Sequence, residues 1–147
     1  IQDEDLGAVD VGTEAFLDVV RTRTTEMIDA FRADGRQVVM IEPVPAAADG
    51  DDPLTCLSEA TFFDECTFET HTEPTPVESV YRELADAEPD SAYSFDLDRE
   101  VCPALPVCDP VIDGLIVRWD PAHLTQRFAT TLTDAFGAFL DGNGVLA

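Results

Sequence analysis

The sequence has 147 residues, about the length of one domain, and its 31 acidic residues against 8 basic ones give a formal net charge of −23. Such a surface repels phosphate backbones and anionic lipid headgroups, which excludes nucleic acid and membrane surfaces as partners. No apolar run approaches the roughly 18 residues of a membrane span, and the opening residues "IQDEDLGAVD" lack the basic and apolar regions of a signal peptide. The acidity indicates either simple solubility or a cationic partner.

A helix followed by a strand is the first predicted pair of elements. Residues 13–34 carry apolar side chains at helical spacing, with Thr13 as a suitable N-cap and Gly35 as a suitable stop. Residues 36–45, "RQVVMIEPVP", form a short, continuous apolar run that is typical of a strand buried on both faces of a parallel sheet. A helix leading directly into such a strand is half of a βαβ unit.

The remaining elements follow in a similar order. Residues 45–75 predict a long irregular segment with one helical turn. Later patterns predict a helix over 76–89, a strand over 92–97, a hairpin or tight turn at 113–114 and a final helix over 121–142. Helices alternating with strands indicate an α/β layer architecture. Because the first element is a helix with no strand before it, we expect either that the first strands are missing from this chain or that the sheet is small.

The four cysteines predict disulfides more readily than a metal site. They lie at Cys56, Cys66, Cys102 and Cys108, none of them in the close C-x-x-C pairs that zinc sites use. Three pairings are possible, and the spacing favours the two local ones, Cys56 with Cys66 and Cys102 with Cys108. Paired thiols indicate an oxidising, extracytoplasmic compartment. Zinc ligation and free thiols remain the alternatives.

The stretch "RWDPAHLT", residues 118–125, contains one of the two histidines of the chain. If Pro121 is the first helical residue, Asp120 is the N-cap and His123 the third residue of the helix, so capping geometry brings the carboxylate to the imidazole. The helix N-terminus disfavours an imidazolium while Asp120 stabilises it, a balance that suits a general base. The simpler interpretation is a helix cap and a surface histidine.

Other candidates lie around this pair and elsewhere. Trp119 and Arg118 adjoin it, and either could line an acyl or sugar pocket, although a core position also suits Trp119. His71 in "FETHTEP" is expected to be a solvated loop residue. Asp96 and Asp98 flank a strand end, where α/β folds gather ligand-binding groups, although solvation is the simpler interpretation. A metal site built from Asp120, His123 and a third carboxylate is a further alternative to the expectation of no metal and no cofactor.

In its context, "RWDPAHLT" resembles the last conserved block of SGNH-type (GDSL-like) esterases and acyltransferases, in which Asp-x-x-His supplies the acid and the base. The sequence is most similar to the SGNH domain fused to membrane acyltransferase-3 proteins, over residues 35–45, 56–66, 96–108 and 120–125. The resemblance implies a three-layer α/β/α flavodoxin-like fold, with His123 as the general base and Asp120 as its orienting acid.

The same resemblance raises the question of the nucleophile. In the family the nucleophilic serine follows Gly-Asp on the first strand, and the residues of the oxyanion hole also precede the region matched here. None of the serines of this chain follows Gly-Asp at a strand end; they are Ser58, Ser79, Ser91 and Ser94. The resemblance therefore implies that residues 1–147 form a single domain, the C-terminal portion of an SGNH-like domain whose N-terminal strand and nucleophile are absent from this chain.

Two functions are open at this point. The first is the acid–base portion of an extracytoplasmic serine acyltransferase or esterase that acts on O-acyl groups of cell-surface glycans or glycolipids. Its partners would be an acyl donor, a glycan or glycolipid acceptor, and a missing N-terminal segment or a fused transmembrane acyltransferase domain. Its location would be the periplasm, the cell envelope or the medium, with a membrane tether outside this chain as an option. The second is a non-catalytic, disulfide-stapled module that binds carbohydrate or protein, with Asp120 only capping the last helix.

Overall fold

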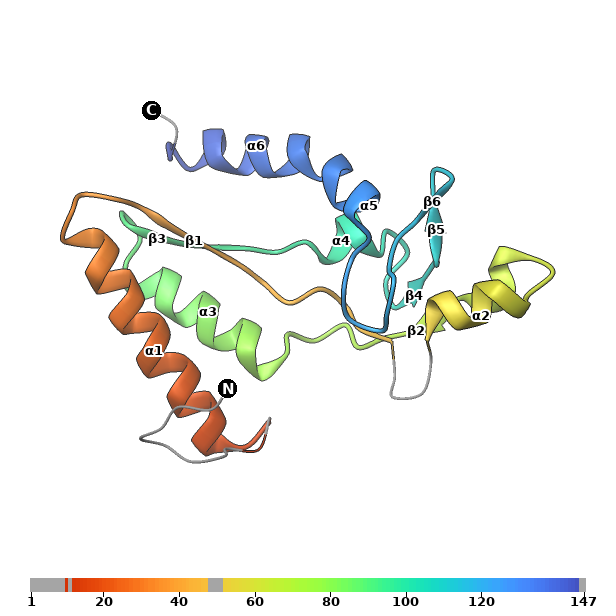
Figure 1. The fold of residues 1–147 in the computed structure, drawn as a ribbon. Helices are drawn as coiled ribbons and strands as arrows, with labels where there is room; N and C mark the ends of the chain where they lie inside the picture. Colours follow the sequence, from red (N-terminus) through yellow and green to blue (C-terminus); the bar gives the residue numbers. More distant parts are fainter. Residues whose placement is uncertain (1–9, 11, 48–51, 146–147) are drawn as a thin grey trace. The chain divides into compact units, whose positions relative to one another are not determined.

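The structure is a computed structural model that describes residues 10, 12–47 and 52–145. Helices and three two-stranded sheets alternate along the described chain, as expected of an α/β protein (Figure 1). Contacts divide the chain into two compact units, one of residues up to Glu42 with Pro74–Phe95 and one of Pro43–Glu73 with residues from Asp96 onwards. Within the described ranges, no helix has the length and apolar character needed to cross a membrane.

Two helices and two parallel strands make up the first unit. They are α1 (Glu14–Arg32), β1 (Val38–Ile41), α3 (Pro76–Ala87) and β3 (Ala92–Phe95). As predicted, Thr13 caps α1, its hydroxyl accepting the Phe16 N–H at 3.2 Å, and Gly35 adopts a left-handed conformation after the helix. Helix α3 begins with a capping box between Thr75 and Glu78.

The core of this unit lies between the strand pair and the two helices. Val38 on β1 pairs with Ala92 on β3 in parallel register, and α1 packs beside α3. The buried cluster consists of Ile28, Val38, Met40 and Ala92, with Tyr81, Leu84 and Ala85 packed against it. The prediction of a strand buried on both faces is wrong for β1, because Ile41 is 53% exposed while Val38 and Met40 are buried. Alternation along the strand puts Ile41 on the face opposite to this cluster.

A buried carboxylate links the same elements. Glu42 follows β1 directly, and its side chain accepts hydrogen bonds from Arg82 Nε at 2.9 Å, Arg82 Nη2 at 2.6 Å and Ser94 Oγ at 2.6 Å. Charge-assisted, two-pronged bonds of this kind compensate for the burial of the carboxylate. Glu42 therefore connects the end of β1 to α3 and to β3.

The second unit contains short helices and short strands. They are α2 (Pro53–Glu59), the 3₁₀ helix η1 (Phe63–Cys66), β2 (Phe68–Glu69), α4 (Asp98–Val101), β4 (Val107–Cys108), β5 (Val111–Ile112), β6 (Leu115–Ile116), α5 (Gln126–Thr131) and α6 (Thr133–Gly142). The segment predicted as irregular thus holds α2, η1 and β2, which pairs with β4. The predicted tight turn is a β5–β6 hairpin in which Asp113 and Gly114 both have positive φ.

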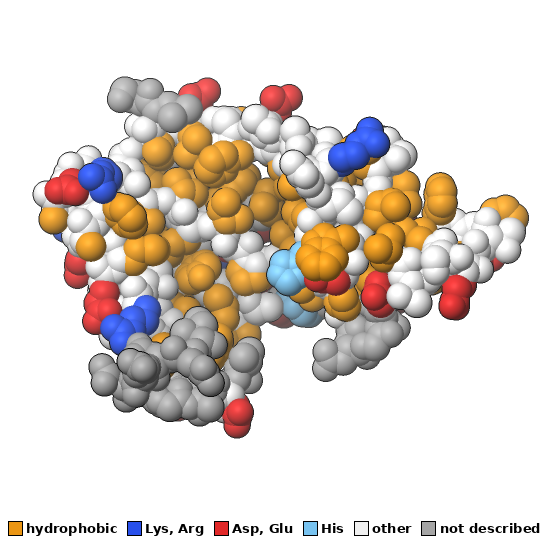
Figure 2. All heavy atoms as spheres, viewed as in Figure 1, with side chains coloured by type: hydrophobic (Ala, Val, Ile, Leu, Met, Phe, Trp, Pro, Cys, Tyr) orange, Lys and Arg blue, Asp and Glu red, His pale blue; other side chains and the backbone are white. Residues whose placement is uncertain are grey.

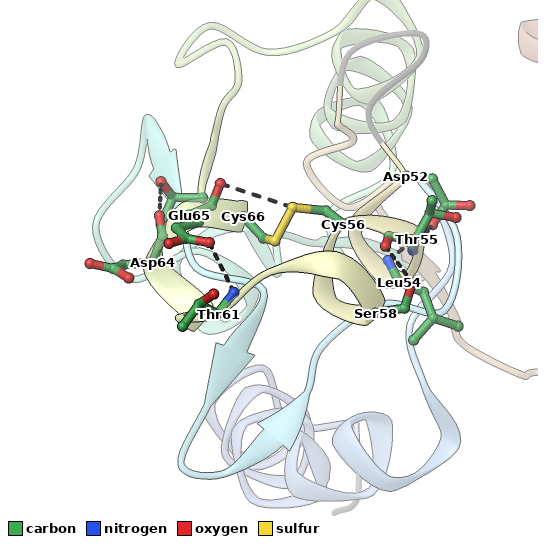
Figure 3. Close-up of a disulfide and its surroundings, with 10 residues drawn as sticks. Asp52, Leu54, Thr55, Cys56, Ser58, Thr61, Asp64, Glu65 and Cys66 are labelled. Atoms are coloured by element: carbon green, nitrogen blue, oxygen red, sulfur yellow. Dashed lines mark hydrogen bonds between the residues drawn. A yellow bond between two sulfur atoms is a disulfide. The ribbon is translucent and has the colours of Figure 1, made fainter.

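Both local disulfides are present. Cys56 in α2 is bonded to Cys66 at the end of η1, and Figure 3 shows this bond joining the two helical segments. Cys102 is bonded to Cys108, and both are fully buried in a cluster with Ala47 and Phe68. The first disulfide closes a surface loop, whereas the second is part of the core of the unit.

The final helix differs from its prediction. It begins at Gln126, not at Pro121, and is divided at Leu132 into α5 and α6 before ending at Gly142 as expected. Its N-cap is Thr125, whose hydroxyl accepts the Phe128 N–H at 3.2 Å. A β-bridge between Arg118 and Leu124 closes a turn that ends just before this cap. Asp120 and Pro121 therefore lie in the turn and not in the helix.

Candidate active site

Residues 118–125 form a closed turn, called here the dyad turn, that carries Asp120 and His123. The Oδ1 atom of Asp120 accepts the backbone N–H of Ala122 at 2.8 Å and that of His123 at 2.7 Å, which is an Asx-type turn. Its Oδ2 atom lies 2.7 Å from Nδ1 of the His123 ring. One carboxylate therefore shapes the backbone with one oxygen and holds the imidazole with the other.

The base of the dyad turn is held by main-chain bonds on both sides. The Trp119 N–H donates to the His123 carbonyl at 3.1 Å, and the Thr125 N–H donates to the Val117 carbonyl at 2.8 Å. The Thr125 hydroxyl adds a bond to the Ile116 carbonyl at 2.6 Å while capping α5. Since hairpin β5–β6 leads into one side and α5 leaves from the other, both elements position the turn.

The hydrogen bonds also set the ionisation of Asp120. Partial desolvation raises the pKa of its carboxyl, but the bonds from the Ala122 N–H, the His123 N–H and the His123 ring outweigh this, so the net pKa lies below its ordinary value. Asp120 is therefore an anion at neutral pH. An ionised carboxylate can only accept, so the ring bond requires a proton on Nδ1, and a neutral ring in this arrangement has Nε2 as its acceptor.

The histidine of this pair is open to solvent. The His123 side chain is 70% exposed, and its Nε2 has no hydrogen-bond partner in the described part of the chain. Figure 2 shows histidine side chains at the surface beside hydrophobic and acidic neighbours. Trp119, which is 55% exposed, stacks on the imidazole with a centroid separation of 5.6 Å and an interplanar angle of 26°. Nε2 is thus a free acceptor on an oriented ring.

Arg118, the other predicted neighbour, is only 1% exposed and faces the interior of its unit. Its Nη2 donates to the Pro45 carbonyl at 2.6 Å, and its guanidinium carbon lies 5.1 Å from the centre of the Phe68 ring. Desolvation lowers its pKa to about 10, and its Nε and Nη1 atoms have no partner among the described residues. Arg118 therefore anchors the start of the dyad turn to Pro45. The Ala47 N–H donates to the Pro121 carbonyl at 3.1 Å and anchors the same turn a second time.

The other candidate residues have hydrogen-bond partners other than Asp120 and His123. His71 is exposed and its Nδ1 lies 2.8 Å from the Glu73 carbonyl, while the Asp98 N–H donates to an Asp96 carboxylate oxygen at 2.8 Å. Three serine hydroxyls donate elsewhere, to Thr55, Thr75 and Glu42; they belong to Ser58, Ser79 and Ser94. No group of three or more His, Cys, Asp or Glu side chains suited to a metal ion is found within residues 10, 12–47 and 52–145.

A hollow of about 370 Å³ lies elsewhere in the same unit, beside the Cys56–Cys66 disulfide. Its lining includes the acidic side chains of Asp52, Glu59 and Glu65 but neither member of the pair. The Asp120–His123 pair therefore lies outside this hollow, with His123 exposed and Asp120 half-buried.

Sequence reasoning overlooked two residues that hold the site. Thr125 could have been found, because threonine is a good N-cap and directly precedes the helix that forms. Pro45 carried no such signal, since its carbonyl meets Arg118 across 73 positions in the sequence.

A model of the family described as "SGNH domain (fused to AT3 domains)" matches residues 3–138. Comparison with curated proteins and with solved structures gave no match.

Proposed function

The chain belongs to the family of SGNH domains fused to AT3 domains, and on that premise we propose that His123 and Asp120 are the general base and the orienting acid of an acyl-transfer site. SGNH domains are esterase- and acyltransferase-type hydrolases, so the family supports the reaction class. The roles of the two residues follow from the local chemistry of the dyad turn.

The observation that carries this proposal is the 2.7 Å contact between Asp120 Oδ2 and His123 Nδ1. It orients the imidazole, selects the Nδ1–H form and stabilises the imidazolium that develops when Nε2 accepts a proton, which is the part a carboxylate has in a Ser-His-Asp triad. The Asx-type bonds to Ala122 and His123 hold that carboxylate in place. The exposure of His123 leaves Nε2 accessible to a hydroxyl group.

The reaction has two steps, and in each step His123 takes up one proton and gives it back. In the first, Nε2 takes the proton of a serine hydroxyl as the serine oxygen attacks the acyl carbonyl carbon, and the imidazolium then returns that proton to the departing alcohol. In the second, Nε2 takes the proton of water or of an acceptor hydroxyl, which attacks the acyl-serine, and the serine recovers its proton from the imidazolium. Water as acceptor gives an esterase, and a sugar hydroxyl gives an acyltransferase.

The serine of this scheme is supplied, in our proposal, by a polypeptide segment outside residues 1–147. The hydroxyls of Ser58, Ser79 and Ser94 already donate to Thr55, Thr75 and Glu42 respectively. The first strand of a three-layer flavodoxin-like sheet is the place that the family resemblance suggests for the nucleophile. The two units of this chain would then be parts of one domain.

The family and the disulfides also support a proposal for the substrates and the location of the domain. The acyl acceptor is a hydroxyl of a cell-surface glycan or glycolipid, and the fused AT3 domain that the family description names is the natural source of the acyl group. The two disulfides are typical of proteins outside the cytoplasm. The domain therefore acts in the periplasm, in the cell envelope or in the medium, anchored where an AT3 domain is attached.

The test is the hydrolysis of 4-nitrophenyl acetate by a protein that contains these residues together with the serine segment. We expect His123→Ala to lower kcat by about 10²- to 10⁴-fold, the usual contribution of a general base. His71→Ala is the matched control, because His71 is the other histidine of the chain and is exposed; this variant should keep full activity. Full activity of His123→Ala would overturn the proposal and favour the alternative, a non-catalytic binding module.

A further inference from the structure

We propose that Trp119 is a positioning residue, whose indole ring holds the His123 imidazole in the orientation that Asp120 requires. The catalytic consequence of this role rests on the function proposed above. The contact itself stands on the geometry of the dyad turn.

The His123 ring needs a second contact. Its side chain is 70% exposed, and its ring hydrogen bond in the described part of the chain is the one from Nδ1 to Asp120. This hydrogen bond fixes the position of Nδ1, but small coupled rotations about the Cα–Cβ and Cβ–Cγ bonds still tilt the ring and move Nε2. A general base is effective only when its acceptor nitrogen stays close to the reacting hydroxyl.

Trp119 supplies that contact from the opposite side of the turn. The two rings are 5.6 Å apart between centroids and inclined at 26°, which is an offset stack. The Trp119 N–H also donates to the His123 carbonyl at 3.1 Å, so the separation of the two backbones is fixed by the same pair of residues. The imidazole is therefore held at its edge by Asp120 and on its face by Trp119.

The indole is itself well placed to give this support. The preceding residue, Arg118, is locked in the interior by its bond to Pro45 and its contact with Phe68. Trp119 is 55% exposed, so core packing accounts for only part of its ring surface. An exposed aromatic ring on a rigid stem, against the base of the site, is suited to orienting that base.

The direct test is NMR on the chain of residues 1–147, which needs no substrate. In the native protein the Hα–Hβ couplings of His123 should report one side-chain rotamer, and the indole ring current should displace the His123 ring protons from their ordinary shifts. In Trp119→Leu the couplings should become averaged and the displacement should vanish. Trp119→Phe should retain one rotamer, and His71 serves as the internal reference. A single His123 rotamer in a folded Trp119→Leu variant would overturn the proposal.

Kinetics on the serine-containing protein provide the second test. An aromatic pair shifts a conformational equilibrium by about 2- to 12-fold, so Trp119→Leu should lower kcat by that factor at nearly constant KM, with recovery in Trp119→Phe. A raised KM at unchanged kcat would assign Trp119 to substrate binding and overturn the proposal. If His123→Ala proved fully active, the proposed function would fall, and the NMR couplings would still decide whether Trp119 orients the ring.

Discussion

The two carboxylate oxygens of Asp120 accept hydrogen bonds from different groups. Oδ1 accepts two backbone N–H groups and so closes the dyad turn, while Oδ2 accepts the His123 ring. Sequence reasoning expected both contacts but attributed the first to helix capping. The Asx-type turn gives the same proximity without a helix, because a three-residue separation brings the carboxylate to the N–H of His123 in either geometry.

The lowered pKa of Asp120 makes this contact sensitive to acid. Because its folded-state pKa is depressed, the ionised carboxylate adds stability that is complete above the unfolded value of about 3.9 and is lost as the pH falls through the folded value. We therefore expect the difference in unfolding free energy between the native chain and Asp120→Asn to be constant above about pH 5 and to shrink below about pH 4.

Urea denaturation between about pH 5 and pH 2.5 tests this, a range that spans the ordinary pKa of an aspartate carboxyl. The comparison with Asp120→Asn cancels the titration of the other acidic groups, which both proteins share. Exposed Asp86 provides the control, since Asp86→Asn removes a carboxylate of helix α3 outside the dyad turn. A difference that stays constant down to pH 2.5 would contradict the acid-sensitive role of Asp120.

At the scale of elements, local patterns predicted the helices and the hairpin well wherever the signals agreed. Helix α1 begins at its predicted cap Thr13, and the Asp113-Gly114 turn forms the expected hairpin. The start of the last helix was mispredicted because two good caps, Asp120 and Thr125, compete within six residues of "DPAHLT". The bridge from Arg118 to Leu124 decides between them, and it is a strand-type backbone pairing that helix propensity does not encode.

Thr125 should therefore stabilise the start of helix α5. Its hydroxyl accepts the Phe128 N–H and donates to the Ile116 carbonyl, so Thr125→Ala removes a cap and a tie to β6. We expect a loss of about 1–2 kcal/mol in unfolding free energy, with a smaller loss in Thr125→Ser, measured by urea denaturation.

The matched control is Thr13→Ala at the start of α1. Thr13 also caps a helix and bonds a carbonyl, that of Asp10, but in an exposed position. Its loss should be no larger than that of Thr125→Ala. An unchanged stability in Thr125→Ala would contradict the helix start at Gln126.

For the whole molecule, the net charge and the disulfides act on the stability of the fold in opposite directions. A net charge of −23 makes the folded chain repel itself, and compact states of such chains need additional stabilisation. The two disulfides supply it by restricting the unfolded chain, with sequence separations of 10 and 6 residues. The chain-entropy model assigns each of these loops about 2–3 kcal/mol, slightly more for the longer one.

The structure predicts the reverse order for removal of the two bonds. Cys102 and Cys108 are fully buried against Ala47 and Phe68, so replacing both by alanine also leaves unfilled space in the core. We expect the double variant Cys102→Ala/Cys108→Ala to lose about 1 kcal/mol more than Cys56→Ala/Cys66→Ala, measured by urea denaturation. Equal losses, or a larger loss for the Cys56–Cys66 pair, would contradict the contribution of core packing at Cys102 and Cys108.

The sequence by itself determined the features that depend on residues close together in the chain. The proximity of Asp120 to His123, the local pairing of the cysteines and the turn at Asp113-Gly114 all follow from short spacings, which leave the backbone few alternatives. The tertiary structure decided what depends on distant partners and on burial. Pro45 draws Arg118 into the interior across 73 positions, and Glu42 binds Arg82 and Ser94 across 40 and 52 positions. Packing selects one arrangement among many that local preference permits, so these contacts emerge only when the chain is folded.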